Sequence, residues 1–228
     1  MARRALVVDD EVATCELIQK VLYAAGVDAL AITKSSQAPG LLAEGKFDLV
    51  LFDLHMVPHD GIELAREVRN GKSNQDTPII LLSDDQRPSA MTQGFAAGAS
   101  FFLYKPVDKA RLLRLVRATQ QQSGVERRQT RRVVLHTKVR LRCGAEEVVC
   151  DAVDVSLNGV LVRSPRIFPR GSAVQISMEL TRGLRPLVGG GSVARIPAPN
   201  QMGIALDRLS IEESERLQEF LLPMIPRD

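Results

Sequence analysis

The segment Leu49-Val50-Leu51-Phe52-Asp53 is a short apolar run that ends in a carboxylate. Four similar runs occur in the first half of the chain, and three of them also end at a polar side chain. They cover residues 5–8 before Asp9-Asp10, 29–32, 79–82 before Ser83, and 101–104 before Lys105. Continuous apolar runs of this length are typical of parallel strands that are covered on both faces.

Helical patterns lie between these runs, and glycines close several of them. The expected helices cover residues 14–25, 36–44, 61–70, 89–97 and 108–121. This five-fold alternation predicts an α/β fold, a doubly wound five-stranded parallel sheet, for a first domain of residues 1–121. The carboxyl ends of parallel strands meet at one edge of such a sheet, where ligands bind.

That edge would collect Asp9, Asp10, Asp53, Ser83 and Lys105. Three carboxylates in one pocket repel each other and raise their pKa values unless a cation is present, and hard oxygen ligands of this kind suit Mg²⁺. A lysine and a hydroxyl are groups that can surround a phosphoryl oxygen. A single aspartate after a strand is as often a helix N-cap, but five such positions together indicate a site.

These residues and their spacing resemble the receiver domain of two-component response regulators, a flavodoxin-like fold, over residues 3–121. The resemblance implies that a histidine kinase or phosphotransfer protein phosphorylates Asp53. It also implies that Asp10, Asp53 and the backbone carbonyl of His55 bind Mg²⁺, with Asp9 assisting through water. Lys105, before the cis-prone Pro106, would contact the phosphoryl group. Ser83 would follow the phosphoryl oxygen while Phe102 changes rotamer.

Two features depart from that pattern. In the loop after Asp53, proline stands at position 58, one place later than is usual in the family, and Asp84 occupies a place usually held by a small residue. No catalytic group is lost, but Asp84 and His55 could alter phosphorylation kinetics. His55 and His59 have no metal-ligand spacing, so we interpret them as exposed loop residues.

The second half, residues 122–228, has short apolar segments separated by Gly and Pro turns, a pattern typical of an all-β antiparallel barrel. Six strands and a C-terminal helix over 211–222 are expected. The strands cover residues 133–142, 147–155, 159–163, 173–180, 188–196 and 202–206. Gly189-Gly190-Gly191 is expected to form a flexible hairpin at a sheet edge, because no Lys-Ser/Thr follows it as in a phosphate-binding loop.

Four arginines crowd the segment Glu126-Arg127-Arg128-Gln129-Thr130-Arg131-Arg132 between the two halves. Such a cluster could be a solvated linker, a nucleic-acid arm or an anion clamp. Residues 122–228 have a formal charge of +4 against −1 for residues 1–121, which favours an anionic partner. The chain has 2 Tyr, 7 Phe and no Trp, and no recognition-helix pattern follows, so nucleic acid is disfavoured.

Asp154-Val155-Ser156-Leu157-Asn158-Gly159 is a weak motif alone. Together with an upstream Arg-x-x-x-Arg it resembles the PilZ family, receptors for cyclic di-GMP, over residues 125–222. Guanidinium groups grip phosphate and stack on purines, and a carboxylate suits the N1–H and N2–H edge of guanine.

The resemblance assigns ligand binding to Arg128, Arg132, Asp154, Ser156 and Gly159. The pair Arg127 and Arg131 has the same spacing, but Arg132 leads directly into the first barrel strand, so we prefer Arg128 with Arg132. A basic residue at position 127 accompanies a stacked ligand dimer in the family.

The remaining composition is typical of a cytoplasmic protein. Cys15, Cys143 and Cys150 form an odd set without Cys-x-x-Cys spacing, which argues against both a disulfide framework and a structural zinc site. The N-terminus is too short and too acidic for a signal peptide, and no apolar run has the length of a membrane span.

We therefore interpret the chain as a non-enzymatic signalling adaptor that uses Mg²⁺ and binds cyclic di-GMP. Its partners would include an unidentified downstream protein of motility, adhesion or polysaccharide export. The short polar linker predicts some coupling between phosphorylation and ligand affinity. Two alternatives remain: a phosphorylation-controlled nucleic-acid binder, and a docking module that no longer binds ligand.

Overall fold

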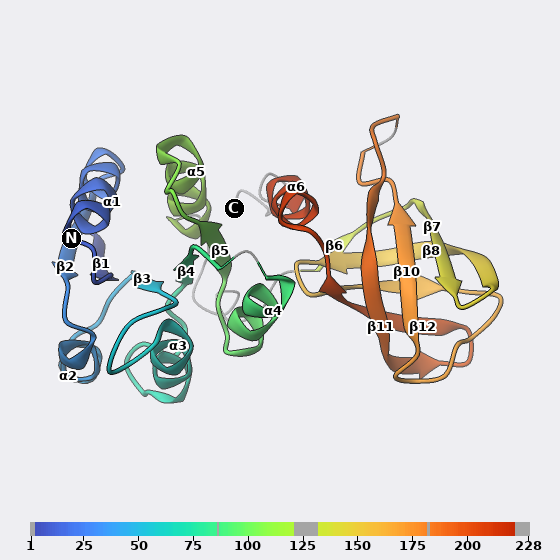
Figure 1. Cartoon of the computed structure of the whole chain (residues 1–228), viewed down its shortest axis with the longest axis horizontal. Helices are drawn as coiled ribbons and strands as arrows, with labels where there is room; N and C mark the ends of the chain where they lie inside the picture. The colour runs from blue at the N-terminus through green and yellow to red at the C-terminus, as the bar shows by residue number, and fades with distance from the viewer. Residues whose placement is uncertain (1–2, 86, 121–131, 182, 222–228) are drawn as a thin grey trace. The chain divides into compact units, whose positions relative to one another are not determined.

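The computed structural model describes residues 3–85, 87–120, 132–181 and 183–221. The chain divides into two compact units, one within residues 1–129 and the other within residues 130–226 (Figure 1). The domain boundary expected between residues 121 and 122 falls outside the described residues. Within the described helices, none combines the length and the apolar character that crossing a bilayer requires.

The first unit is a five-stranded parallel sheet with the order β2-β1-β3-β4-β5, as expected. Its strands are β1 (Arg3–Val8), β2 (Val27–Ile32), β3 (Leu49–Asp53), β4 (Ile79–Ser83) and β5 (Phe101–Tyr104). All five residues of β3 and of β4 are buried, because helices cover both faces of the sheet.

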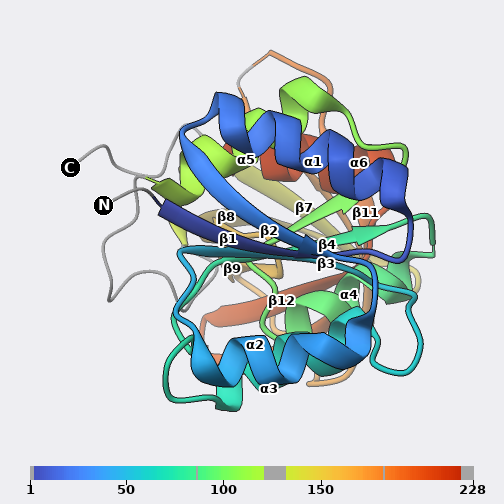
Figure 2. The same cartoon turned by 90° about the vertical axis from the view of Figure 1, so that its left-hand side faces the viewer.

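Among the described residues of this unit, four α-helices connect consecutive strands and a fifth, α5, follows β5. They are α1 (Val12–Ala24), α2 (Ala38–Glu44, after a 3-10 turn at Ser35–Gln37), α3 (Gly61–Asn70), α4 (Pro88–Ala96) and α5 (Lys109–Gln120). Helices α1 and α5 cover one face of the sheet, and α2, α3 and α4 cover the other (Figure 2). Helix α3 begins with a capping box, in which the Asp60 carboxylate accepts from the Glu63 amide at 2.7 Å.

The second unit is a closed antiparallel barrel. Its strands are β6 (Val133–Val134), β7 (Lys138–Cys143), β8 (Glu146–Ser156), β9 (Gly159–Arg163), β10 (Ala173–Met178), β11 (Leu187–Ala198) and β12 (Gln201–Arg208). Six strands form the ring β8-β7-β10-β11-β12-β9, which the β8–β9 pairing closes, and β6 pairs only with β8. Helix α6 (Ile211–Leu221) follows the barrel, as expected.

Two local expectations for the barrel were wrong. The strand expected over residues 133–142 is divided into β6 and β7. Gly189-Gly190-Gly191 is not a hairpin at an edge but the interior of β11, which pairs with both β10 and β12. A Cβ at Gly191 would lie 2.2 Å from the carbonyl oxygen of Ala205, so the glycines here allow close strand contact.

Candidate functional site

The carboxyl ends of β1, β3, β4 and β5 meet at one edge of the sheet, and each places a polar side chain there. The strand registers pair Val8 with Phe52, Asp53 with Leu82, and Ser83 with Tyr104. As a result, the residues that follow each strand are neighbours. The sheet therefore brings together the polar positions that the sequence singled out.

Asp9, Asp10 and Asp53 form a carboxylate cluster in which one oxygen of each lies within 4.8 Å of the others. Asp9 and Asp53 are buried, whereas Asp10 is exposed. Burial raises the pKa of Asp9 and of Asp53 above the usual range, against the opposing effect of the nearby Lys105 ammonium.

The fit of this cluster to a divalent cation can be judged from Asp9. Its Oδ2 atom is buried and, among the described residues, has no hydrogen-bond partner. The Lys105 ammonium lies 3.0 Å away as an ion pair, outside hydrogen-bond geometry. A buried carboxylate oxygen that accepts no hydrogen bond can still coordinate a cation, and two further carboxylates lie beside it. This set matches the hard oxygen ligands that Mg²⁺ requires.

Lys105 is the cation of the site. Its Nζ atom donates to Asp53 Oδ2 at 3.0 Å and to Glu11 Oε2 at 3.3 Å. Burial lowers the pKa of Lys105, but its contacts with Asp9 and Asp53 outweigh this effect and the net shift is upward. Glu11 was not expected at the site; its position directly after Asp9-Asp10 was the only signal in the sequence.

Ser83 and Phe102 are buried, as are Asp9 and Asp53. Ser83 is fully buried, and its Oγ atom accepts from the Asp85 amide at 2.9 Å. Phe102 is buried in β5 with its ring centroid 5.1 Å from that of Tyr104 and 6.5 Å from that of Phe95. Both residues border the site from neighbouring strands.

A cavity of about 650 Å³ opens at this edge of the sheet, and its lining includes residues from the ends of β1, β3, β4 and β5, among them Asp10, Asp53, His55, Asp84 and Lys105. Asp84, the position that departs from the receiver pattern, is therefore at the mouth of the site. The peptide bond before Pro106 is cis, as the sequence suggested, and so is the bond before Pro58.

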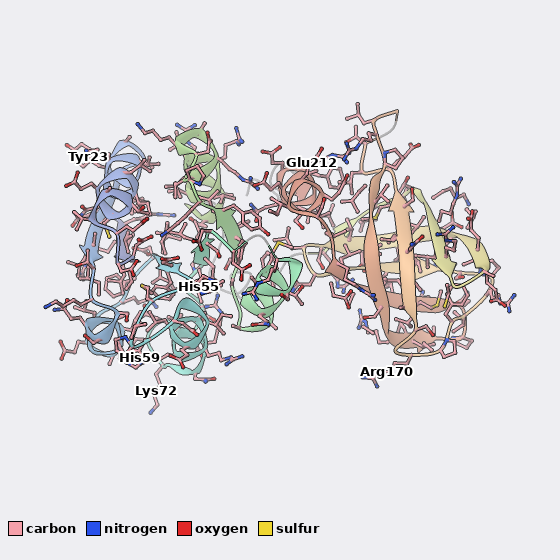
Figure 3. The ribbon with its side chains drawn as sticks, viewed as in Figure 1. Tyr23, His55, His59, Lys72, Arg170 and Glu212 are labelled. Carbon is pink, nitrogen blue, oxygen red and sulfur yellow. The ribbon has the colours of Figure 1, made fainter. Side chains whose placement is uncertain are left out.

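Asp85, the residue after Asp84, links the loop that follows β4 to the loop that follows β3. Asp85 Oδ2 lies 3.6 Å from His55 Nε2 across the mouth. Asp85 also binds Arg87 in a bidentate pair, which holds the pKa of Asp85 well below its usual range. His55 and His59 both project from the loop after β3 (Figure 3), and His59 Nδ1 lies 3.8 Å from Glu63.

On the barrel, β6 places Arg132 beside Asp154 of β8. The guanidinium of Arg132 donates a hydrogen bond to Asp154 Oδ1. Ser156 closes the following turn and donates from Oγ to the Gly159 carbonyl at 3.3 Å. Arg127 and Arg128 lie outside the described residues.

Two glycines support these sites by close packing that the sequence did not reveal. A Cβ at Gly159 would lie 2.4 Å from the carbonyl oxygen of Ile204 in β12. A Cβ at Gly61 would lie 2.4 Å from the carbonyl oxygen of Asp53. Real Cβ atoms do not approach oxygen this closely, so both positions exclude any side chain.

Comparison with known proteins agrees with this architecture. Residues 5–117 match the family model "Response regulator receiver domain", and residues 126–222 match the model "PilZ domain". Together these two matches span nearly all of the chain.

Two curated relatives each match about half of the chain. The Sensory/regulatory protein RpfC of Xanthomonas campestris pv. campestris is 36% identical over 112 residues, which is 48% of this chain and 15% of that protein. The Phosphate regulon transcriptional regulatory protein PhoB of Pseudomonas aeruginosa is 31% identical over 124 residues, 54% of each chain. The chain thus spans only 15% and 54% of the lengths of these relatives.

A solved structure described as that of a response regulator from Chloroflexus aurantiacus is 26% identical, with a TM-score of 0.51. The match covers 54% of this chain and 100% of that one. Receiver and PilZ domains are signalling and binding modules rather than families of catalysts. The chain is a response regulator that joins a receiver domain, residues 5–117, to a PilZ domain, residues 126–222.

Proposed function

We propose that this protein is a two-component signalling adaptor in which Asp53 accepts a phosphoryl group and the PilZ domain binds cyclic di-GMP. The phosphoryl donor would be a histidine kinase or a phosphotransfer protein. The observation that carries the first half of this proposal is the placement of Lys105 Nζ 3.0 Å from Asp53 Oδ2, within a cluster of three carboxylates.

In the proposed transfer, a carboxylate oxygen of Asp53 attacks the phosphorus of a phosphohistidine. The new O–P bond replaces the N–P bond, and the imidazole leaves with the bonding electron pair. Asp9, Asp10, Asp53 and the His55 backbone carbonyl would hold Mg²⁺, which, when bound, supplies positive charge to the phosphoryl oxygens.

The remaining residues of the receiver site have proposed roles around the acyl phosphate. Lys105 neutralises charge on the phosphoryl group after its ion pair with Asp53 is broken. Ser83 follows a phosphoryl oxygen with its hydroxyl, and Phe102 changes rotamer in response. The burial of Ser83 and Phe102 in the adjacent strands β4 and β5 supports these roles, because a close-packed interior passes the shift of one side chain on to its neighbours.

In the PilZ domain, we assign the phosphate grip and purine stacking to Arg128 and Arg132, and the guanine edge to Asp154. The hydrogen bond from Arg132 to Asp154 supports this assignment, because it sets a phosphate-binding group beside a guanine-binding group. Ser156 adds a hydrogen bond, Gly159 permits close approach of the backbone, and Arg127 would accompany a stacked ligand dimer.

Equilibrium dialysis with cyclic di-GMP tests the second half of the proposal. The double variant Arg128→Ala, Arg132→Ala should lose binding. A matched control is Arg140→Ala, Arg142→Ala, which removes two exposed arginines of β7 that pair instead with Glu147 and Gln175. Binding that is absent in the wild type, or equal in the two double variants, would refute the assignment.

A small-molecule phosphodonor tests the first half, since it should label the wild type in the presence of Mg²⁺ and leave Asp53→Ala unlabelled. Equal labelling of both proteins would exclude Asp53 as the acceptor. A DNA mobility shift that weakens with salt and persists in Asp154→Ala would instead favour nucleic-acid binding by the arginines.

A further inference from the structure

The outer wall of the barrel carries a row of residues that starts at Asp154 and crosses four strands of the ring. The registers pair Asp154 of β8 with Leu161 of β9, Leu161 with Gly203 of β12, and Gly203 with Arg195 of β11. Directly paired residues of antiparallel strands project to the same face. The row therefore places Arg195 on the same face as Asp154.

Burial confirms that this face is the outer one. The sequence neighbours of Leu161 and Gly203, which project to the opposite face, are at most 2% exposed. They are Val160, Val162, Met202 and Ile204. Arg195 is exposed, whereas Asp154 and Leu161 are half-buried.

The side chain of Arg195 extends along this row toward Asp154. A Cβ at Gly203 would lie 2.7 Å from Arg195 Cγ and 3.0 Å from its Nε, so the side chain crosses β12 over a position that has no side chain. Among the described residues, Arg195 has no hydrogen-bond or ion-pair partner. By contrast, Arg140 and Arg166 of the same unit pair with glutamates.

The surface between the two ends of the row is low on one side. Leu161 and Gly203 form the middle of the row, and the adjoining row on that side pairs Ser156 with Gly159 and Gly159 with Ala205, whereas the row on the other side pairs Asp151 with Arg163 and Arg163 with Gln201. No long or charged side chain stands between Asp154 and Arg195 on the row itself or on the adjoining row that contains Gly159. Three strand spacings separate these two residues, roughly 14 Å along the wall, a span that suits a flat dinucleotide.

From this geometry we infer that Arg195 is a further ligand-contacting residue, which binds the guanine of cyclic di-GMP that Asp154 does not hold. The inference rests on the proposed function of the PilZ domain. A guanidinium can stack on a purine face or donate two parallel hydrogen bonds to guanine O6 and N7. A lysine ammonium is not planar and cannot donate two parallel hydrogen bonds, so it cannot make these contacts.

Titration of the full chain with cyclic di-GMP tests the inference with three variants. Arg195→Ala and Arg195→Lys should each bind at least tenfold more weakly than the wild type, at an unchanged unfolding temperature. Arg170→Ala is the matched control, because Arg170 is also exposed and unpaired among the described residues, but points outward from the loop between β9 and β10 (Figure 3). It should bind like the wild type.

Three results would overturn the inference. They are binding by Arg195→Ala within twofold of the wild type, binding by Arg195→Lys as tight as that of the wild type, and binding by Arg170→Ala as weak as that of Arg195→Ala. Either of the last two results would mean that Arg195 contributes only its positive charge and makes no specific contact with guanine. If the wild type itself does not bind, the proposed function fails and the inference fails with it. Only the inference fails if the wild type and Arg195→Ala both bind cyclic di-GMP while the double variant Arg128→Ala, Arg132→Ala does not.

Discussion

The guanidinium of Arg132 donates a hydrogen bond to Oδ1 of Asp154, which lies twenty-two positions later in the chain. Both side chains remain partly open to solvent, at 39% and 20% exposure. Ion pairs of this kind contribute only about 0–1 kcal/mol to stability. The pair therefore matters for orienting the two groups more than for holding the barrel together.

Asp154→Asn should separate these two effects. The amide keeps the shape of the carboxylate but loses the charge that guanine N1–H and N2–H require, so cyclic di-GMP affinity should fall at least tenfold, about 1.4 kcal/mol. The free energy of unfolding should change by less than about 1 kcal/mol. Calorimetric titration and chemical denaturation of the same samples measure both quantities.

Asp151→Asn is the control for this variant, since Asp151 lies on the same strand and pairs with Lys138 at 2.6 Å. It should change neither affinity nor stability. A large loss of stability in Asp154→Asn, or an equal loss of affinity in Asp151→Asn, would show that the carboxylate at 154 does not recognise ligand.

The buried carboxylates of the receiver predict a dependence of stability on pH. In metal-free protein, burial raises the folded-state pKa of Asp53 above its unfolded value, so the folded state binds more protons between those two values. Stability should therefore fall as pH rises through that interval. Asp53→Asn should unfold at a higher temperature than the wild type at pH 7 in chelator, and the difference should shrink toward pH 4.

Mg²⁺ provides the complementary test of the same carboxylate. A cation that binds only the folded state raises stability with its concentration, so added Mg²⁺ should raise the unfolding temperature of the wild type and leave that of Asp53→Asn nearly unchanged. Asp28→Asn, which alters an exposed carboxylate of β2, should behave like the wild type throughout. A wild type that is insensitive to Mg²⁺ would contradict the metal site.

Local sequence patterns were sufficient for the order and type of nearly all the elements. The apolar runs before Asp9, Asp53, Ser83 and Lys105 predicted the parallel strands, because both faces of those strands are buried. Since parallel strands end at a common edge, the composition of the site followed from the same observation.

What the sequence could not supply depends on strand register. Residues 133–142 read as one strand, but β8 has a bulge between Ala152 and Asp154, and there the pairing passes from β7 to β6. The position of Arg195 opposite Gly203 likewise needs three registers to be known together. Neither feature has a local pattern.

Arg69 is a structural cation that sequence patterns did not single out. Its guanidinium donates to the carbonyl oxygens of Gln75, Thr77 and Gly98, with its shortest contacts at 2.7 Å. Burial lowers the pKa of Arg69 to about 10. This arginine therefore ties the end of α3 to the segments that precede β4 and β5.

Arg69→Met should destabilise the receiver domain by about 2–3 kcal/mol, because it keeps the aliphatic stem but leaves those carbonyl groups without their charged donor. Arg66→Met removes an exposed arginine from the same helix and should stay within about 0.5 kcal/mol of the wild type. Urea denaturation compares the two. Equal stabilities would show that water replaces the guanidinium without cost.

Two explanations for the glycine at position 159, ligand binding and strand packing, can be distinguished by experiment. The sequence motif suggested that glycine at this position admits the ligand, whereas in the structure a Cβ there would lie 2.4 Å from the Ile204 carbonyl oxygen of the adjacent strand. A backbone carbonyl cannot move aside as a side chain tip can. Gly159→Ala should therefore destabilise the barrel by about 1–3 kcal/mol, as overpacking does.

Ser156→Ala is the informative comparison, since it removes only the hydroxyl that donates to the Gly159 carbonyl. It should weaken cyclic di-GMP binding and cost about 0.5–1.5 kcal/mol of stability. Thermal unfolding without ligand distinguishes the two explanations for Gly159. If Gly159→Ala unfolds like the wild type but no longer binds, the glycine serves the ligand; if it unfolds early, the contact between β9 and β12 requires it.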